Sequence, residues 1–226
     1  MAASSGSADI EKTLAVHQRL IAVYGPRRLR PSRTPLDELI LTILSQNTSD
    51  INSGRTFERL RATYPTWEAV LDAPTAELYE VIKPAGLGNI KAPRIQNTLH
   101  SILERHGALS LDFLDDMPLD EARAWLTSLK GIGPKTAACV LLFALGKPAL
   151  PVDTHVYRIA KRLGLIGPKV SADAAHSQLE AALPAKAIYA FHINMIQHGK
   201  RICHAQRPKC FECPLNDICN LYQGVV

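Results

Sequence analysis

Lys135 and Asp153 are the two residues of this chain whose types and spacing most directly permit chemistry. Lys135 lies at the start of a predicted helix, where a cation is unfavourable beside the helix dipole, and this favours loss of its proton. A neutral lysine amine is a nucleophile, whereas a lysine that keeps its proton would neutralise a phosphate. Asp153 lies eighteen residues later and directly before Thr154, where it can cap the next helix or serve as a catalytic carboxylate.

A glycine turn, Gly131-Ile132-Gly133-Pro134, comes directly before Lys135. Gly131 and Gly133 permit backbone dihedrals closed to other residues, and they let a ligand approach without a Cβ in the way. Pro134 suits the first position of a helix, where its missing N–H costs nothing. The free N–H groups at that helix start favour an anion such as phosphate. The segment resembles the helix-hairpin-helix DNA-binding motif, and a plain corner between two helices is the alternative.

The chain between the turn and the aspartate is long enough to bring Lys135 and Asp153 together. A helix from Lys135 to Leu145 would be ~16 Å long. The eight residues from Gly146 to Asp153 can extend to about 26 Å, which is enough to return to the start of that helix. We therefore predict that the two side chains share one cleft.

Four cysteines lie near the C-terminus, at Cys203, Cys210, Cys213 and Cys219. In a cytoplasmic chain such a cluster binds metal more often than it forms disulfides. Four thiolates suit zinc or an iron–sulfur cluster, and the single short spacing, between Cys210 and Cys213, favours the iron–sulfur cluster. Cys139 lies in an apolar run and is predicted to be a core residue.

The elements that must position these residues are predicted to be helices. Pro35 begins a helix with apolar residues on one face, and a polar break separates it from a helix capped by Asp50. No segment alternates with a period of two, so the fold class is predicted to be all-α. Further helices are predicted at 9–24, 66–71, 75–82, 119–129, 154–163, 171–183 and 186–200. One more is predicted to follow the segment 83–92 and to end at His106.

Composition sets broader limits. The 226 residues, of which 46% are apolar, are enough for one or two domains with a real core. The formal net charge of +5 only weakly favours a polyanionic partner. No apolar run approaches the ~20 residues of a membrane span. Met1–Ser7 lacks the features of a signal peptide, so we predict a cytoplasmic protein, nucleoid-associated if bacterial, with no membrane partner.

Taken together, these motifs resemble the endonuclease III family of base-excision DNA glycosylases. The resemblance rests on Leu129-X-Gly-Ile-Gly-X-Lys-Thr-Ala, on Val-Asp-Thr-His, and on His198-Gly199 followed by Cys-X6-Cys-X2-Cys-X5-Cys. It extends from about Leu36 to Cys219. It implies two helical domains with duplex DNA in the cleft between them, one at 28–147 as a six-helix bundle and one that joins 1–27 to 148–226. The protein is expected to act as a monomer.

The resemblance also implies a role for each motif residue. Lys135 would be the Schiff-base nucleophile and Asp153 its carboxylate partner, and the four C-terminal cysteines would ligate a [4Fe–4S] cluster. The family usually has proline in place of Lys130 and a gap-filling glutamine at or beside Asn47, so the base preference stays open. The remaining DNA contacts are expected from Lys130, Gly131, Ile132 and Gly133, from Leu87 as an inserting wedge, and from Gln46 or Asn47 as gap filler.

The resulting hypothesis is a bifunctional glycosylase and abasic-site lyase for oxidised pyrimidines. A mismatch or modified-pyrimidine glycosylase on the same fold is the first alternative, and a non-enzymatic DNA-binding iron–sulfur protein is the second. The joint presence of Lys135 and Asp153 argues against the second, because a binding module has no evident need for both. An adenine-specific relative is disfavoured because Lys135 is present.

Overall fold

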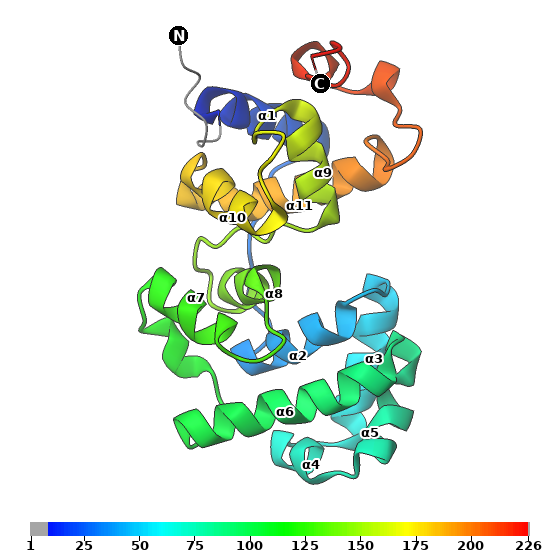
Figure 1. Cartoon of the computed structure of the whole chain (residues 1–226), viewed down its shortest axis with the longest axis vertical. Helices are drawn as coiled ribbons and strands as arrows, with labels where there is room; N and C mark the ends of the chain where they lie inside the picture. The colour runs from blue at the N-terminus through cyan, green and yellow to red at the C-terminus, as the bar shows by residue number, and fades with distance from the viewer. Residues whose placement is uncertain (1–8, 226) are drawn as a thin grey trace. The chain divides into compact units, whose positions relative to one another are not determined.

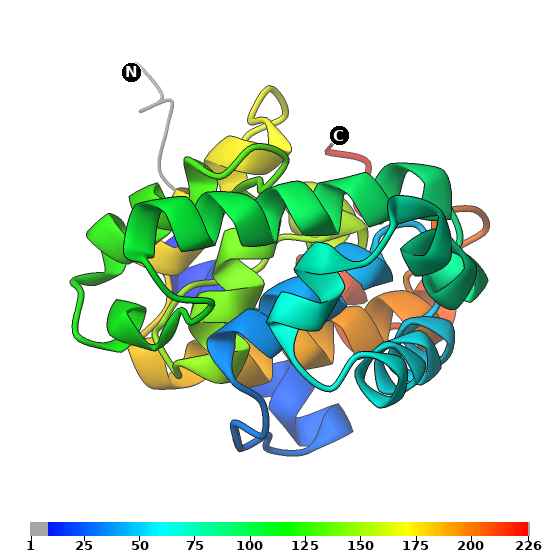
Figure 2. The same ribbon diagram turned by 90° about the horizontal axis from the view of Figure 1, so that it is seen from below.

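The structure, a computed structural model, describes residues 9–225. The segment 1–7, on which the predicted cytoplasmic location depends, lies outside these residues. The described residues form helices and loops without a β-strand, which confirms the predicted all-α class (Figures 1 and 2). None of the described helices is both long and apolar enough to span a membrane.

The chain divides into two compact units, with boundaries beside residues 30 and 145, where the sequence placed them at 27 and 147. The central unit, Pro31–Leu145, contains α2 (Pro35–Ser45), α3 (Asp50–Thr63), α4 (Trp67–Asp72), α5 (Thr75–Ile82), η1 (Lys83–Ala85), α6 (Gly88–His106), η2 (Asp112–Asp115), α7 (Leu119–Thr127), α8 (Pro134–Cys139) and η3 (Val140–Ala144). The terminal unit joins the N-terminal segment to Gly146–Val226 and contains α1 (Ile10–Tyr24), α9 (Thr154–Leu163), α10 (Ala172–Ala181), η4 (Ala185–Ala187), α11 (Ile188–Arg201), η5 (Cys210–Glu212) and η6 (Asn216–Ile218).

Helix α2 is the centre of the central unit, because it contacts α3, α6, α8 and η3. Its apolar face is buried as the helical spacing predicted, and it comprises Leu36, Leu39, Ile40, Ile43 and Leu44. Burying a side chain of this size contributes about 1.5–3 kcal/mol relative to leaving it exposed. The long helix α6 lies against α4 and α5 (Figure 2). The residues that open α6 and α8 therefore rest on one packed core.

Two predicted helices differ in detail from those observed. Ser49, not Asp50, caps α3, because the Ser49 hydroxyl accepts a hydrogen bond from the Asn52 N–H at 3.2 Å. The predicted single α-helix from Lys135 to Leu145 is also wrong. It is α8 followed by the π-helix η3, a variant with i→i+5 hydrogen bonds that is frequent at functional sites.

Helix α11 is the centre of the terminal unit, where it contacts α1, α9 and η4. Phe191 and Met195 of α11 are fully buried. The face of α9 that the sequence predicted to be apolar, Val156, Ile159, Ala160 and Leu163, is buried as well. The polar face of α9 is thus left to carry the cationic side chains described below.

Candidate functional site

The glycine turn of the central unit joins α7 to α8. The Ile132 N–H donates to the Leu129 carbonyl at 3.0 Å, and the buried Ile132 side chain anchors the turn in the core. Gly131 has a φ of +85°, in the region that favours glycine, and a Cβ there would lie 3.2 Å from Arg94 Nε. Lys130 and Gly131 are exposed. The turn is thus held from below, while its outer surface is free to meet a ligand.

Of the two reasons that the sequence suggested for Gly133, the need for a special backbone dihedral does not hold. Its φ of −91° and ψ of 176° are extended backbone that any residue adopts, and a Cβ would meet no atom within 4 Å. Neither conformation nor packing within the described residues therefore requires glycine at this position. The backbone where α8 begins is therefore open to the close approach of a ligand.

Lys135 is half-buried in the first turn of α8, a helix that contacts α2. A carboxyl group that sequence reasoning missed, that of Glu38 on α2, interacts electrostatically with it. Glu38 is 8% exposed, and the Thr42 hydroxyl donates to its Oε1 at 3.5 Å. Burial raises the pKa of Glu38 to about 7, and the opposing effects of Arg33, Thr42 and Lys135 are smaller. In the sequence, Glu38 is indistinguishable from an ordinary acid in a first helical turn.

Replacing Glu38 by glutamine is expected to remove a pH dependence of stability. A folded-state pKa near 7 against an ordinary value of 4.5 means that stability is fully present below pH 4.5 and is lost as pH rises through 7. The loss amounts to about 3 kcal/mol at 1.36 kcal/mol per pKa unit. Urea unfolding at pH 4.5 and pH 8.5 measures it, and Glu38→Gln should be less sensitive to pH by that amount. Equal sensitivity in the two proteins would contradict a buried titrating carboxyl.

The three side chains predicted to enter DNA lie on two neighbouring loops of the central unit. Leu87 is 45% exposed and has a φ of +51°, and Asn47 is exposed with a φ of +55°. Gln46 is half-buried, and its Oε1 accepts a hydrogen bond from Arg94 Nη1 at 2.8 Å. The two amides that the sequence could not distinguish therefore have different environments, and of the two only Asn47 is exposed.

Asp153, in the terminal unit, is half-buried and caps α9, because its Oδ1 accepts from the Val156 N–H at 2.8 Å. Two buried histidines that sequence reasoning missed contact the carbonyl groups of the segment before Asp153. His192 Nδ1 lies 2.9 Å from the Pro151 carbonyl, and His176 Nδ1 lies 2.7 Å from the Leu150 carbonyl. The carboxylate is therefore fixed in orientation. The predicted pair of Lys135 and Asp153 takes one residue from each unit.

The two motifs of the terminal unit pack on each other. A Cβ at Gly199 would lie 2.4 Å from His155 Nδ1, so the glycine of the His198-Gly199 pair makes room for the histidine of Val-Asp-Thr-His. Arg158 continues this contact, because its Nη2 lies 3.1 Å from His155 Nδ1 and donates to the Cys203 carbonyl at 2.8 Å. The helix that Asp153 caps is thereby joined to the first cysteine.

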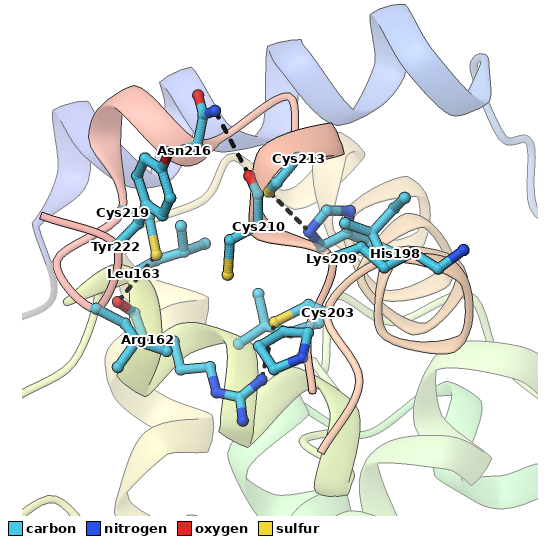
Figure 3. Close-up of a pocket in the computed structure, with 14 residues that line it drawn as sticks. Arg162, Leu163, His198, Cys203, Lys209, Cys210, Cys213, Asn216, Cys219 and Tyr222 are labelled. Carbon is cyan, nitrogen blue, oxygen red and sulfur yellow. Dashed lines mark hydrogen bonds between the residues drawn. The ribbon is translucent and has the colours of Figure 1, made fainter. Parts of the chain in front are cut away.

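Cys203, Cys210, Cys213 and Cys219 line one pocket (Figure 3). Its apolar wall includes Ile159, Leu163, Ile202 and Leu221. Among residues 9–225, no three His, Cys, Asp or Glu side chains are close enough to hold a single metal ion. A [4Fe–4S] cluster instead takes one thiolate on each iron. The donor set and the apolar wall fit such a cluster, whose role here would be to hold the C-terminal loops on α9 and α11.

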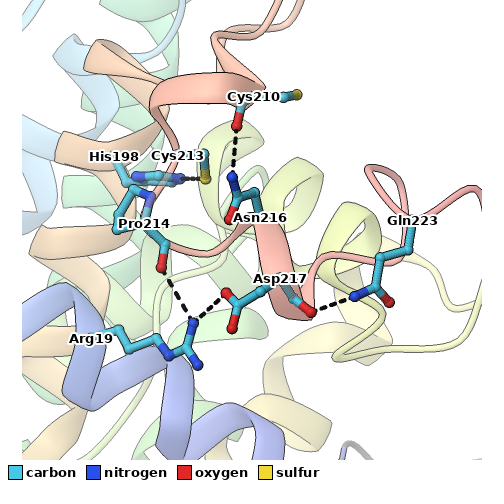
Figure 4. A network of polar contacts seen from close by, with 8 residues as sticks. All are labelled: Arg19, His198, Cys210, Cys213, Pro214, Asn216, Asp217 and Gln223. Atoms are coloured by element: carbon cyan, nitrogen blue, oxygen red, sulfur yellow. Dashed lines mark hydrogen bonds and ion pairs between the residues drawn. The ribbon is translucent and has the colours of Figure 1, made fainter.

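Two side chains place a nitrogen atom beside a cysteine sulfur. Arg162 Nη1 lies 3.3 Å from Cys203 Sγ, and His198 Nε2 lies 3.6 Å from Cys213 Sγ. The Tyr24 hydroxyl lies 3.0 Å from the other His198 nitrogen, Nδ1. Figure 4 shows the His198–Cys213 contact and the ion pair between Arg19 and Asp217, which joins α1 to η6. The sequence shows that arginine, histidine and tyrosine side chains are present, but it does not show which groups they contact.

Metal binding is expected to depend on the C-terminal cysteines and not on Cys139. Burial raises the pKa of the Cys213 thiol to about 11, so iron must displace its proton at neutral pH. Cys213→Ala is expected to lose most of the bound iron and sulfide and the visible absorption of a cluster. Cys139→Ala is the matched control, because Cys139 is a buried core residue of α8. Stoichiometric zinc in a colourless wild-type protein would contradict the cluster.

Comparison with known proteins places the chain in a class. Residues 40–185 match the HhH-GPD superfamily of base excision DNA repair proteins, and residues 203–219 match the iron–sulfur binding domain of endonuclease III. The chain is 35% identical over 189 residues to endonuclease III of Thermotoga maritima, and the match covers 84% of each chain. It therefore belongs to the endonuclease III family, and its cofactor is the [4Fe–4S] cluster of that family.

Two further relatives are informative. A protein provisionally named as a DNA glycosylase in Arabidopsis thaliana is 36% identical over 190 residues, and the match covers 80% of this chain but 64% of that protein. A solved structure of a trapped endonuclease III–DNA covalent intermediate has a TM-score of 0.79 at 30% sequence identity, covering 96% of this chain and 98% of that one. A thermostable thymine-DNA glycosylase, at 23% identity and a TM-score of 0.77, shares the fold.

Proposed function

We propose that this chain is a DNA N-glycosylase and abasic-site lyase that removes oxidised pyrimidines from duplex DNA. The observation that carries the proposal is the place of Lys135, in the first turn of α8 and two residues after the uncrowded Gly133. A helix start of this kind can bind a phosphate of the DNA backbone through its free N–H groups. The Lys135 amine then lies beside the bound DNA backbone. The resemblance to endonuclease III and to its trapped DNA intermediate supports the proposal.

The first step is extrusion of the damaged nucleotide, because a base in the stack shields the sugar carbon from attack. Unstacking costs a few kcal/mol, and side chains that fill the gap offset part of it. Leu87 supplies an exposed apolar wedge. Asn47 supplies the amide that meets the opposite base, since Gln46 is held by Arg94.

The second step is chemistry at the sugar. The neutral Lys135 amine attacks C1′, the new C–N bond forms, and the C1′–base bond breaks with its electron pair leaving on the base. The C1′–O4′ bond breaks and O4′ takes a proton, which opens the ring to a Schiff base. A proton is then lost from C2′ and the C3′–O bond breaks, so that the strand on the 3′ side leaves with the phosphate at its 5′ end. Asp153 stabilises the cationic sugar and assists deprotonation of the amine. Cys203, Cys210, Cys213 and Cys219 would hold the cluster, which would have a structural part in the terminal unit that carries Asp153.

A panel of lesion-bearing duplexes tests the proposal. Base release and strand nicking are scored separately on duplexes with an oxidised pyrimidine, a mismatched pyrimidine, a methylated pyrimidine or a preformed abasic site. The proposal predicts release and nicking on the oxidised pyrimidine and nicking on the abasic duplex. Binding with neither reaction would instead identify a non-enzymatic DNA-binding iron–sulfur protein.

A second candidate function is supported by Asn47. Its amide has a stem one methylene shorter than that of glutamine, and its φ of +55° sets its direction. A shorter stem reaches the opposite base differently and can favour a mismatched or modified pyrimidine. Release confined to those two duplexes would establish this candidate over the first.

A further inference from the structure

Lys91 is the most deeply buried cation of the central unit. It lies in the first turns of α6, it is 1% exposed, and its ammonium donates to two backbone carbonyls, those of Leu44 at 2.7 Å and Ala85 at 2.9 Å. Both carbonyls are at the C-terminal ends of short helices, α2 and η1, where the last carbonyl groups carry partial negative charge and need donors. A single ammonium therefore caps two helices that are far apart in the sequence.

Stability alone does not explain a lysine at this position. Removing an ammonium from water is strongly unfavourable. Burial and the nearby Arg94 guanidinium lower the pKa of Lys91, which shows that the charged form is disfavoured there. A methionine of similar length would fill the same space without a charge, but it would leave both carbonyls without this donor. What only the lysine offers is a pair of directed hydrogen bonds that set the distance between two loops.

The loops that follow the two carbonyls are those proposed to enter DNA. Asn47 lies three residues after Leu44, and Leu87 lies two residues after Ala85. Both have a positive φ, +55° and +51°, a strained conformation that a non-glycine residue keeps only where the surroundings impose it. The backbone N–H of residue Lys91 donates to the Leu87 carbonyl at 2.9 Å, a helical bond that does not depend on the side chain. The Lys91 ammonium thus contacts the backbone shortly before Asn47 and shortly before Leu87.

We propose that Lys91 is a positioning residue that sets the spacing between the Asn47 and Leu87 loops, so that both side chains enter the gap of one extruded nucleotide together. The inference rests on the proposed function of those loops. It assigns to Lys91 no contact with DNA and no part in the chemistry, since its ammonium is fully buried. Its loss should therefore affect only substrates that have a gap to fill.

The test compares borohydride trapping on two preformed abasic substrates, one duplex and one single-stranded. A single strand has no opposite base and no gap, so it reports the Lys135 chemistry alone. Lys91→Met is expected to lower the ratio of duplex to single-strand trapping rates by about ten- to a hundredfold, the scale of a small misplacement of positioning groups. Single-strand trapping should stay within about twofold of wild type. An unchanged ratio, or an equal loss on both substrates, would overturn the proposal.

Two further variants separate the possible causes. Lys83→Met removes an exposed cation of η1 that pairs with Glu80, and it should leave the ratio unchanged. An equal fall in this control would show that lost charge, not loop spacing, is responsible. Lys91→Gln keeps two N–H donors on a shorter stem and carries the test if the methionine variant does not fold, with a smaller fall expected. Wild-type protein that traps neither substrate would instead refute the proposed lyase function.

Discussion

Replacing Lys135 by glutamine is expected to abolish the borohydride-trapped adduct with abasic DNA and to lower strand nicking more than a thousandfold. An amide nitrogen is not a nucleophile, whereas the amine is the group that forms the Schiff base. Glutamine keeps a polar side chain of similar length at a half-buried position of α8, so the fold should survive. Denaturing electrophoresis of trapped, labelled DNA measures the adduct, and circular dichroism with the visible absorption of the cluster checks the fold.

Lys130→Gln is the control for this experiment, because it removes an exposed lysine from the same turn. This variant should need more DNA for half-saturation, with a weaker dependence on salt, and should still form the adduct when DNA is saturating. A full adduct with Lys135→Gln would place the nucleophile elsewhere. Loss of the adduct with Lys130→Gln at saturating DNA would show that the whole turn, and not one amine, is required.

Replacing Asp153 by asparagine is expected to slow base release by about 10²- to 10⁴-fold while leaving stability nearly unchanged. Asparagine keeps the side-chain oxygen that accepts the Val156 N–H, and the two residues are nearly equivalent as N-caps. The substitution therefore removes the charge without removing the cap. Single-turnover rates on an oxidised-pyrimidine duplex measure the chemistry, and urea unfolding measures the stability.

Asp9 offers a matched control in the same unit. It caps α1 by accepting the Lys12 N–H at 2.9 Å, so Asp9→Asn makes the same exchange at a second helix start. This control should leave the rate unchanged. Asp153→Ala should lose about 1 kcal/mol of stability in addition to the rate, because it removes the cap as well. A wild-type rate in Asp153→Asn would reduce Asp153 to a capping residue.

Much of the secondary structure follows from local rules that the sequence displays. Gly25 ends α1, Pro35 opens α2 and Asp153 caps α9, because each has a backbone geometry or hydrogen-bonding capacity suited to that position. The errors are local too. Ser49 and Asp50 are both good capping residues, and the choice between them depends on how α3 packs. The π-helix η3 lies in a uniformly apolar run that has no periodic signal to disturb.

The candidate site was predictable only as far as residue type and spacing define it. Gln46 and Asn47 are equal as amides in the sequence, and only the Arg94 guanidinium separates them. Glu38 and Lys91 read as ordinary helix-surface charges, because a sequence shows that a residue is ionisable but not that it is buried. These are contacts between residues distant in the chain, and no local rule gives them.

By itself, the sequence determined the family, the all-helical fold class, the [4Fe–4S] cofactor and the candidate nucleophile in its glycine turn. Each of these rests on residue types at short spacings along the chain, where the covalent backbone itself limits the distance between residues. The tertiary structure alone decided that Gly133 is uncrowded, that Asn47 is exposed while Gln46 is half-buried, and that Lys91 joins the two loops beside them. The physical reason is that burial and long-range hydrogen bonds exist only after packing, and those are what set the direction and charge of a side chain.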